Sequence, residues 1–135
     1  MKHKGAFEVR EAKQEDISVI DGLITGWLNF DVDREESIRR AIKNKELYVA
    51  EHERKLIGLI HFIKHEDIID GGLNFFITAF YVVPEYQRKG VGSSLLKRII
   101  EDALERGALG VEASTANPEA RRLYEKHCFE QFMGK

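Results

Sequence analysis

The stretch that most constrains the fold is residues 82–96, where an apolar run meets a proline, a short basic loop with two glycines, and then an amphipathic pattern. The pattern predicts a strand, a glycine loop and a helix in succession. The first turn of such a helix presents backbone N–H groups without intrahelical partners, and its peptide dipoles place partial positive charge there. Because Gly90 and Gly92 lack a Cβ, a phosphate can approach the main chain closely. Arg88 and Lys89 add positive charge, so we interpret this stretch as a diphosphate-binding loop.

Two well-known phosphate-binding loops do not fit this stretch. A P-loop requires Lys followed by Ser or Thr after its last glycine, and neither glycine is followed in that way. A dinucleotide-binding fingerprint accommodates Gly90 and Gly92, and Glu112 stands near the position expected for its ribose-binding acid. However, Leu95 replaces its third glycine, and residues 84–89 separate the strand from the loop, where the fingerprint allows almost nothing. Both classes are therefore excluded.

A third pattern, Gln/Arg-x-x-Gly-x-Gly/Ala, matches residues 87–92 at each defined position. The strand before it ends in Val-x-Pro-x-Tyr, and the helix after it carries a Leu-Leu pair. A second block at residues 117–129 reads Asn-Pro-x-Ala-x-x-Leu-Tyr-x-Lys-x-x-Phe. In these two blocks, their order and their spacing, the sequence resembles the GNAT superfamily of acetyl-CoA-dependent N-acetyltransferases.

The resemblance implies that a primary amine attacks the thioester of acetyl-CoA directly. It implies that the diphosphate lies on the loop amides of residues 88–93, and that the pantetheine arm pairs with main-chain groups of the preceding strand. That strand is expected to separate there from the strand at 109–114, which leaves main-chain groups free for the ligand. The implied cofactor-binding residues are Tyr81, Val82, Val83, Gln87, Arg88, Lys89, Gly90, Val91, Gly92, Ser93 and Asn117.

Tyr124 is the one catalytic residue that the resemblance implies, because the family's tyrosine in the second block lies near the thioester sulfur. A phenol with a pKa of about 10 can give a proton to a thiolate whose pKa is about 8.5. Alternatively, the ring of Tyr124 belongs to the core face of an amphipathic helix. Asn117 either faces the cofactor or only caps that helix. Arg88 and Lys89 also fit an ordinary solvated turn.

The sequence does not identify a general base or a metal site. Glu66, Asp67 and Glu112 are candidates for the base, and each also fits an ordinary surface charge. His61 and His65 suggest a metal pair, but four residues along a strand separate them by about 13 Å. Zinc ligands must lie about 2 Å from one ion, so no metal is predicted.

Acceptor choice is expected to depend on the region between the first two helices, where the sequence is acidic, and on the loops near the C-terminus. Its carboxylates suggest a cationic acceptor such as a polyamine, a lysine side chain or a basic peptide, although a capped and solvated helix start would look the same. The residues are Asp31, Asp33, Glu35 and Glu36. Family members usually end in a two-strand hairpin, but the segment after Cys128 has room for one strand. Either the sheet is one strand short, or a partner chain in a homodimer covers the edge.

Apolar periodicity predicts an α/β (α+β) fold, in agreement with the resemblance, which implies a GNAT-like, mixed, mostly antiparallel twisted sheet flanked by about four helices. The predicted strands are residues 6–10, 47–51, 55–64, 74–83 and 109–114, with a shortened C-terminal strand region at 129–133. The predicted helices begin at Gln14, Asp33, Val91 and Asn117 and reach, respectively, about Leu28, Ile42, Gly107 and His127. Leu28 and Leu104 are predicted to lie on buried helix faces.

Length and charge narrow the class of protein further. With 135 residues and 43% hydrophobic content, we expect one domain spanning residues 1–135. The 21 basic and 23 acidic side chains give no reason to expect nucleic acid or a membrane surface as partner. The single Cys128 cannot form an intramolecular disulfide, and no apolar run approaches the roughly 20 residues of a membrane span. We therefore expect a cytoplasmic enzyme, with a non-catalytic acyl-CoA-binding or sensing module as the alternative.

Overall fold

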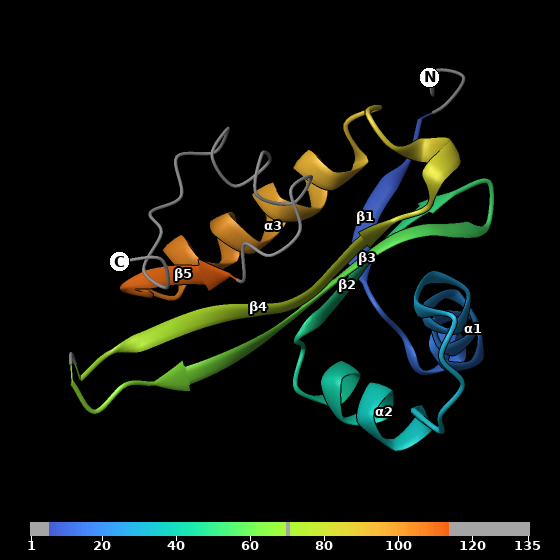
Figure 1. The fold of residues 1–135 in the computed structure, drawn as a ribbon. Helices are drawn as coiled ribbons and strands as arrows, with labels where there is room; N and C mark the ends of the chain where they lie inside the picture. The colour runs from blue at the N-terminus through green and yellow to red at the C-terminus, as the bar shows by residue number, and fades with distance from the viewer. Residues whose placement is uncertain (1–5, 70, 114–135) are drawn as a thin grey trace.

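The computed structural model of the chain describes residues 6–69 and 71–113. In these residues a five-stranded sheet runs in the order β1-β2-β3-β4-β5 (Figure 1). Neighbours from β1 to β4 pair antiparallel, and β5 pairs parallel with β4. The strands are β1 (Glu8–Glu11), β2 (Leu47–His52), β3 (Lys55–Glu66), β4 (Leu73–Val82) and β5 (Gly110–Ala113). The predicted mixed, mostly antiparallel α+β fold is confirmed.

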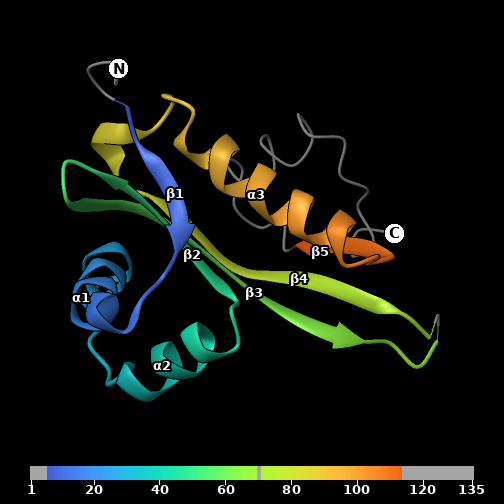
Figure 2. The ribbon, with the colours of Figure 1, turned by 180° about the vertical axis from the view of Figure 1, so that it is seen from behind.

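Helices cover both faces of this sheet. The helices α1 and α2 lie on one face, and α3 crosses the other, as the front and back views show (Figures 1 and 2). The helices are α1 (Ile17–Leu28), α2 (Glu35–Lys43) and α3 (Val91–Glu105), with short 3₁₀ turns η1 (Gln14–Asp16) and η2 (Pro84–Tyr86). The second helix begins at Glu35 and not directly after Asp33, although the carboxylate of Asp33 accepts a hydrogen bond from the N–H of Glu35 at 3.1 Å.

The strands β3 and β4 form a long hairpin that projects beyond the other strands (Figure 1). Their pairing is interrupted once, because His61 pairs with Ala79 whereas Phe62 pairs with Ile77. Thr78 is therefore an extra residue on β4, which makes a β-bulge. The predicted strands at 55–64 and 74–83 are confirmed, with β3 two residues longer than expected.

The core beneath α3 confirms most of that helix's predicted apolar stripe. Leu95, Leu96 and Ile99 are fully buried against Phe62 and Phe75, whose rings stack at 5.2 Å.

Leu104, which was predicted to be buried, is 74% exposed. Along an α-helix each step of four residues turns the side chain by about 40°, so the series Leu96, Ile100, Leu104 rotates out of the interface.

The core on the opposite face is formed by both short helices. Ile20 of α1 and Ile38 of α2 are buried against Val49 and Leu59 of the sheet. Leu28, also predicted to be buried, is 50% exposed, because α1 ends at this residue beyond the edge of that cluster.

Polar contacts on each face of the sheet connect it to the helices. The hydroxyl of Tyr48 on β2 donates a hydrogen bond to the carboxylate of Asp102 on α3, and the guanidinium of Arg98 lies 4.5 Å above the Tyr48 ring. Arg10 of β1 donates to the carboxylate of Asp16 at 2.8 Å, which joins the sheet to the start of α1. Within residues 6–69 and 71–113, none of the helices has both the length and the apolarity needed to cross a bilayer.

Candidate functional site

The loop between β4 and α3 reverses the chain at one end of the sheet. Val83 is extended, as expected before a proline, and Pro84 opens the short turn η2. Within this turn the N–H of Tyr86 donates to the carbonyl of Val83 at 2.9 Å, and the N–H of Gln87 donates to that of Pro84 at 3.2 Å. The helix α3 therefore starts beside the C-terminal end of β4 and runs back along the sheet (Figure 2).

The first turn of α3 presents main-chain donors toward this loop. The first helical hydrogen bond runs from the N–H of Ser94 to the carbonyl of Gly90 at 3.0 Å. The N–H groups of Val91, Gly92 and Ser93 precede that bond, and no residue in the described ranges accepts a hydrogen bond from them. Such a group of donors at a helix N-terminus is suited to an anion.

Gly90 is required at the start of α3 by its backbone conformation. Its φ of 89° lies in the left-handed region, which L-residues other than glycine rarely adopt. A Cβ added at Gly90 would meet no atom within 4 Å, so the space in front of this residue is open. Arg88 is also left-handed, with a φ of 64°. Left-handed residues in such a turn are typical of the main-chain nests that bind anions.

The cationic side chains of the loop lie toward solvent. Lys89 is exposed, and its Nζ lies 5.7 Å from the centroid of the Tyr86 ring. Arg88 is exposed as well. The loop therefore combines main-chain donors with two positive charges, as predicted for a diphosphate site.

Gln87, the first residue of the predicted motif, contacts the preceding strand. Its Nε2 donates a hydrogen bond to the carbonyl of Val82 at 2.9 Å. This bond holds the loop against the end of β4. It also means that the Val82 carbonyl, expected to be free for a ligand, is already hydrogen-bonded within the protein.

The first part of β4 pairs with β5, and the later part extends past the described residues of that strand. The two strands pair only over residues 74–77 of β4, so residues 78–82 continue beyond the described part of β5. Because the N–H of Val83 donates to Ile57 of β3, the alternation of an antiparallel ladder turns Val83 and Tyr81 toward β3 and Val82 toward the opposite edge. Of the three strand residues predicted to contact the pantetheine arm, the geometry therefore favours Val82.

The face of β4 that carries α1 and α2 has an aromatic pair and a polar pair. The ring of Tyr81 stacks on that of Trp27 from α1, with centroids 4.6 Å apart. Next to the bulge, Nδ1 of His61 lies 2.6 Å from Oγ1 of Thr78, which also donates to the His61 carbonyl at 3.2 Å.

Burial lowers the pKa of His61, and the carboxylate of Glu46 offsets this only in part. Sequence reasoning considered this histidine only as a metal ligand. The signal that could have singled it out is a histidine inside an otherwise apolar central strand.

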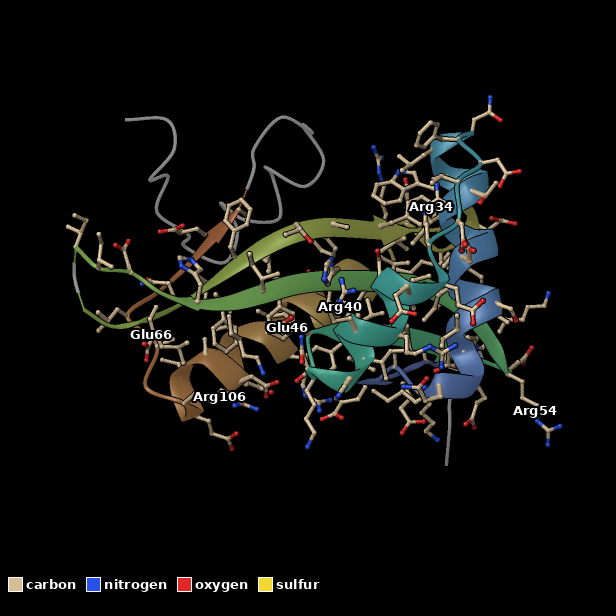
Figure 3. The ribbon with its side chains drawn as sticks, turned by 90° about the horizontal axis from the view of Figure 1, so that it is seen from below. Arg34, Arg40, Glu46, Arg54, Glu66 and Arg106 are labelled. Atoms are coloured by element: carbon tan, nitrogen blue, oxygen red, sulfur yellow. The ribbon has the colours of Figure 1, made fainter. Side chains whose placement is uncertain are left out.

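The carboxylates considered as general bases lie elsewhere. Glu66 is at the far end of the long hairpin (Figure 3). Asp67 belongs to the hairpin turn, where its carboxylate accepts a hydrogen bond from the N–H of Ile69 at 2.8 Å. Glu112 lies on β5 opposite Phe76. Neither Glu66 nor Asp67 is brought near the loop before α3.

The segment between α1 and α2 is held by Arg34 (Figure 3). This guanidinium donates to Asp21 at 2.9 Å, to Thr25 at 3.0 Å and to the carbonyl of Phe30 at 2.6 Å. The segment also exposes apolar side chains, with Phe30 61% exposed and Val32 42% exposed.

Only part of the acidic character predicted for this segment is available to a ligand. Asp33 accepts a hydrogen bond from the N–H of Glu35, and the carboxylate of Glu35 pairs with Arg39 at 2.6 Å. Asp31 and Glu36 are exposed.

Several predicted site residues lie outside the described residues. They include Tyr124, the proposed proton donor, and Asn117, together with the last helix and the C-terminal strand. The predicted shortening of the sheet and the homodimer therefore stay predictions. Across the described ranges, no three His, Cys, Asp or Glu side chains gather as the ligands of a metal ion would.

Comparison with known proteins gives one family and a consistent fold. Residues 16–129 match the model of the acetyltransferase (GNAT) family. Among solved structures, a "predicted acetyltransferase with acetyl-CoA" from Clostridium acetobutylicum is 21% identical over 96% of this chain and 94% of that chain, with a TM-score of 0.76. A ribosomal-protein-alanine N-acetyltransferase from Brucella melitensis biovar Abortus 2308 is 16% identical over 90% and 89%, with a TM-score of 0.75.

An aminoglycoside acetyltransferase from an uncultured soil metagenomic sample is 14% identical over 90% of both chains, with a TM-score of 0.74. A comparison with curated proteins found no match.

Proposed function

The chain belongs to the GNAT acetyltransferase family, and on that premise we propose that it is an N-acetyltransferase that moves the acetyl group of acetyl-CoA to a primary amine. The observation that carries the proposal is the start of α3, where the amides of Val91, Gly92 and Ser93 lie beside the cationic loop residues Arg88 and Lys89. Acetyl-CoA carries both the diphosphate that such a loop suits and the thioester that acetyl transfer requires.

The rest of the cosubstrate would follow the edge of β4. We propose that an extended pantetheine arm leaves the loop beside Val82 and follows the edge of β4 beyond its pairing with the described part of β5. This direction leads toward the β-bulge at Thr78, about 13 Å along the strand from Val82. The thioester would then lie near the middle of the sheet, between its two helical layers.

The chemistry is a direct transfer. The nitrogen of the amine attacks the thioester carbonyl carbon, the C–S bond breaks, and the thiolate of coenzyme A leaves. We propose Tyr124 as the group that gives the thiolate its proton, on the family resemblance. Oriented main-chain donors near the carbonyl would stabilise the negative charge that develops on its oxygen.

The segment between α1 and α2 favours an acceptor that is both cationic and apolar. Asp31 and Glu36 supply exposed negative charge, while Leu28, Phe30 and Val32 expose apolar side chains on the same segment. Two acetyltransferases of similar fold are named for ribosomal-protein alanine and for aminoglycosides, and both of these substrates present amines. We therefore propose an amine attached to an apolar group, such as a basic peptide with apolar residues or an amphiphilic polyamine.

A thiol-release assay tests the proposed function. The chain is given acetyl-CoA and a panel of amines that varies charge and apolar content, and free coenzyme A is followed with a thiol reagent. The proposal predicts amine-dependent release that falls in the Tyr124→Phe variant. Tight acetyl-CoA binding with no release on any amine would instead identify a non-catalytic acyl-CoA-binding module.

The acceptor is tested separately with the same assay. Phe30→Ala and Asp31→Asn should each raise the KM for the preferred amine and leave the KM for acetyl-CoA unchanged. Lys43→Ala, which changes an exposed side chain at the end of α2, serves as the matched surface control. If the KM for the amine does not change in either loop variant, the acceptor does not contact this segment.

We also propose that residues 1–135 act as one catalytic domain in the cytoplasm. The family match covers residues 16–129, and one sheet holds every described strand. A single cysteine in the sequence is compatible with a reducing compartment.

A further inference from the structure

We propose that His61, held by Thr78, accepts the proton that the attacking amine must lose. The inference rests on the proposed transferase function and adds the general base that the sequence did not identify. Its basis is the position of the histidine in the sheet, the hydrogen bonds that orient its ring, and its partial exposure to solvent.

His61 occupies the centre of the sheet, opposite Ala79 on β4 and Leu47 on β2. Its partner Thr78 is the bulge residue, and it directly follows Ile77, the last residue of β4 that pairs with the described part of β5. The imidazole therefore lies beside the bulge of β4, next to the stretch of this strand along which we propose that the pantetheine arm runs. Bulges commonly redirect side chains next to active sites.

The hydrogen bonds fit the tautomer that a base requires. The hydroxyl of Thr78 is within reach of the carbonyl of His61, 3.2 Å away, to which it can donate its single proton. With that proton on the carbonyl, the Thr78 oxygen accepts a hydrogen bond from Nδ1–H of His61, 2.6 Å away, and we assign this tautomer as part of the proposal. In this tautomer Nε2 carries the lone pair, and it is the nitrogen that can take a proton.

The surroundings keep the imidazole neutral yet accessible. His61 is partly buried, and Thr78 is exposed at the surface. Burial lowers the pKa of His61, while Glu46, at the start of β2, favours its protonated form. Glu46 and Arg40 of α2 are both labelled in Figure 3, and Glu46 is the charged side chain that acts on His61. On the β4 side, His61 pairs with Ala79 and contacts Thr78, and neither of these residues carries a charge.

The step balances in protons and electron pairs. An ammonium group has no lone pair, so one proton passes from the amine to Nε2 of His61, directly or through one water. The freed lone pair attacks the carbonyl carbon, the C–S bond breaks, and the thiolate leaves. The second nitrogen proton is released as the amide forms and balances the proton taken up by the thiolate. His61 returns its proton to solvent, so the products are amide, thiol and one proton.

The test compares kinetics and pH dependence in His61→Gln and Thr78→Val with those of the wild type. Glutamine can still hydrogen-bond to Thr78 but cannot act as a base, so kcat/KM for the amine should fall about 10²- to 10³-fold. The acidic limb of the kcat/KM profile should disappear in His61→Gln. The loss of kcat/KM relative to the wild type should become smaller at high pH, where more of the amine is already unprotonated. The Kd for acetyl-CoA should stay unchanged.

Two further variants separate catalysis from structure. Thr78→Val should shift the acidic limb and lower kcat, and Thr78→Ser, which keeps the hydroxyl, should restore both. His65→Gln lies on the same strand and should behave as wild type. In the wild type, the pKa of His61 measured by NMR should equal the pKa of the acidic limb, a readout that does not require His61→Gln to fold.

The results separate a failure of the role proposed for His61 from a failure of the proposed transferase function. Wild-type turnover together with an unchanged kcat/KM and pH profile in folded His61→Gln would overturn the role of His61 and leave the transferase function intact. A mismatch between the NMR pKa and the kinetic pKa would do the same. A wild type that acetylates no amine would overturn the proposed function, and this inference with it.

Discussion

Replacing Gly90 with aspartate tests the proposed diphosphate site most directly. The substitution adds a Cβ and a negative charge at the residue that precedes the free amides of α3, where the added Cβ meets no protein atom. The variant should fold, because nothing in the protein blocks the side chain. It should bind acetyl-CoA poorly, because its carboxylate occupies the space proposed for the diphosphate.

The loss of stability and the loss of acetyl-CoA affinity can both be calculated from the geometry at Gly90. At a φ of 89°, a residue other than glycine costs roughly 1–2 kcal/mol of stability. A carboxylate about 4 Å from a phosphoryl oxygen is repelled by about 4 kcal/mol at an effective dielectric constant of about 20. That energy corresponds to about 10³-fold in Kd, and solvent at the exposed loop screens part of it. We expect the Kd for acetyl-CoA to rise about 10²-fold.

Gly107→Asp is the matched control. Gly107 ends the same helix, has a φ of 72°, and also has no atom within 4 Å of an added Cβ. In urea unfolding, Gly90→Asp should lose no more stability than Gly107→Asp, because the helix dipole favours a carboxylate at the start of α3 and disfavours one at its end. Calorimetric titration should nevertheless show weakened acetyl-CoA binding only for Gly90→Asp. The weakening should lessen at high salt. A folded Gly90→Asp protein that binds acetyl-CoA as tightly as Gly107→Asp would refute the assignment of this loop.

Three further predictions concern stability and can be checked by urea unfolding. Burial and the hydrogen bond to the carboxylate on α3 raise the pKa of Tyr48, so its contribution is complete below the unfolded pKa of about 10 and is lost as pH rises through the higher folded pKa. Tyr48→Phe should therefore cost about 1–3 kcal/mol at pH 7 and lose less stability above pH 10; an unchanged alkaline limb would contradict this. Burial raises the pKa of Asp16, but hydrogen bonds from Arg10 and from the Lys13 N–H lower it further, so the net pKa lies below its usual value. Its contribution is present above the unfolded pKa of about 3.9 and is lost as pH falls through the folded pKa, so Asp16→Asn should weaken this acid dependence. Leu96→Ala should cost about 2–5 kcal/mol and Leu104→Lys almost nothing, and equal costs would show that the burial pattern of α3 is wrong.

The sequence determined the features that depend on neighbours along the chain. The turn at Pro84, the left-handed Gly90 and the start of α3 at Val91 follow from proline geometry, glycine's freedom and helical periodicity. These are local effects, so the loop could be read as an anion site before its structure was known.

Sequence periodicity described burial less well at helix ends. It placed Leu28 and Leu104 inside, although both are largely exposed. Periodicity gives the direction in which a side chain points, whereas burial also depends on where the facing sheet ends. Only the packed structure contains that second quantity.

The tertiary structure alone decided which distant residues meet at the site. His61 and Thr78 are far apart along the chain, and a one-residue bulge brings the imidazole to the hydroxyl. The bond from Gln87 to Val82 and the stack of Trp27 on Tyr81 also depend on packing between elements. The physical reason is that strand register is set by the sum of contacts across the whole sheet, so a pattern read along one segment cannot specify its partner.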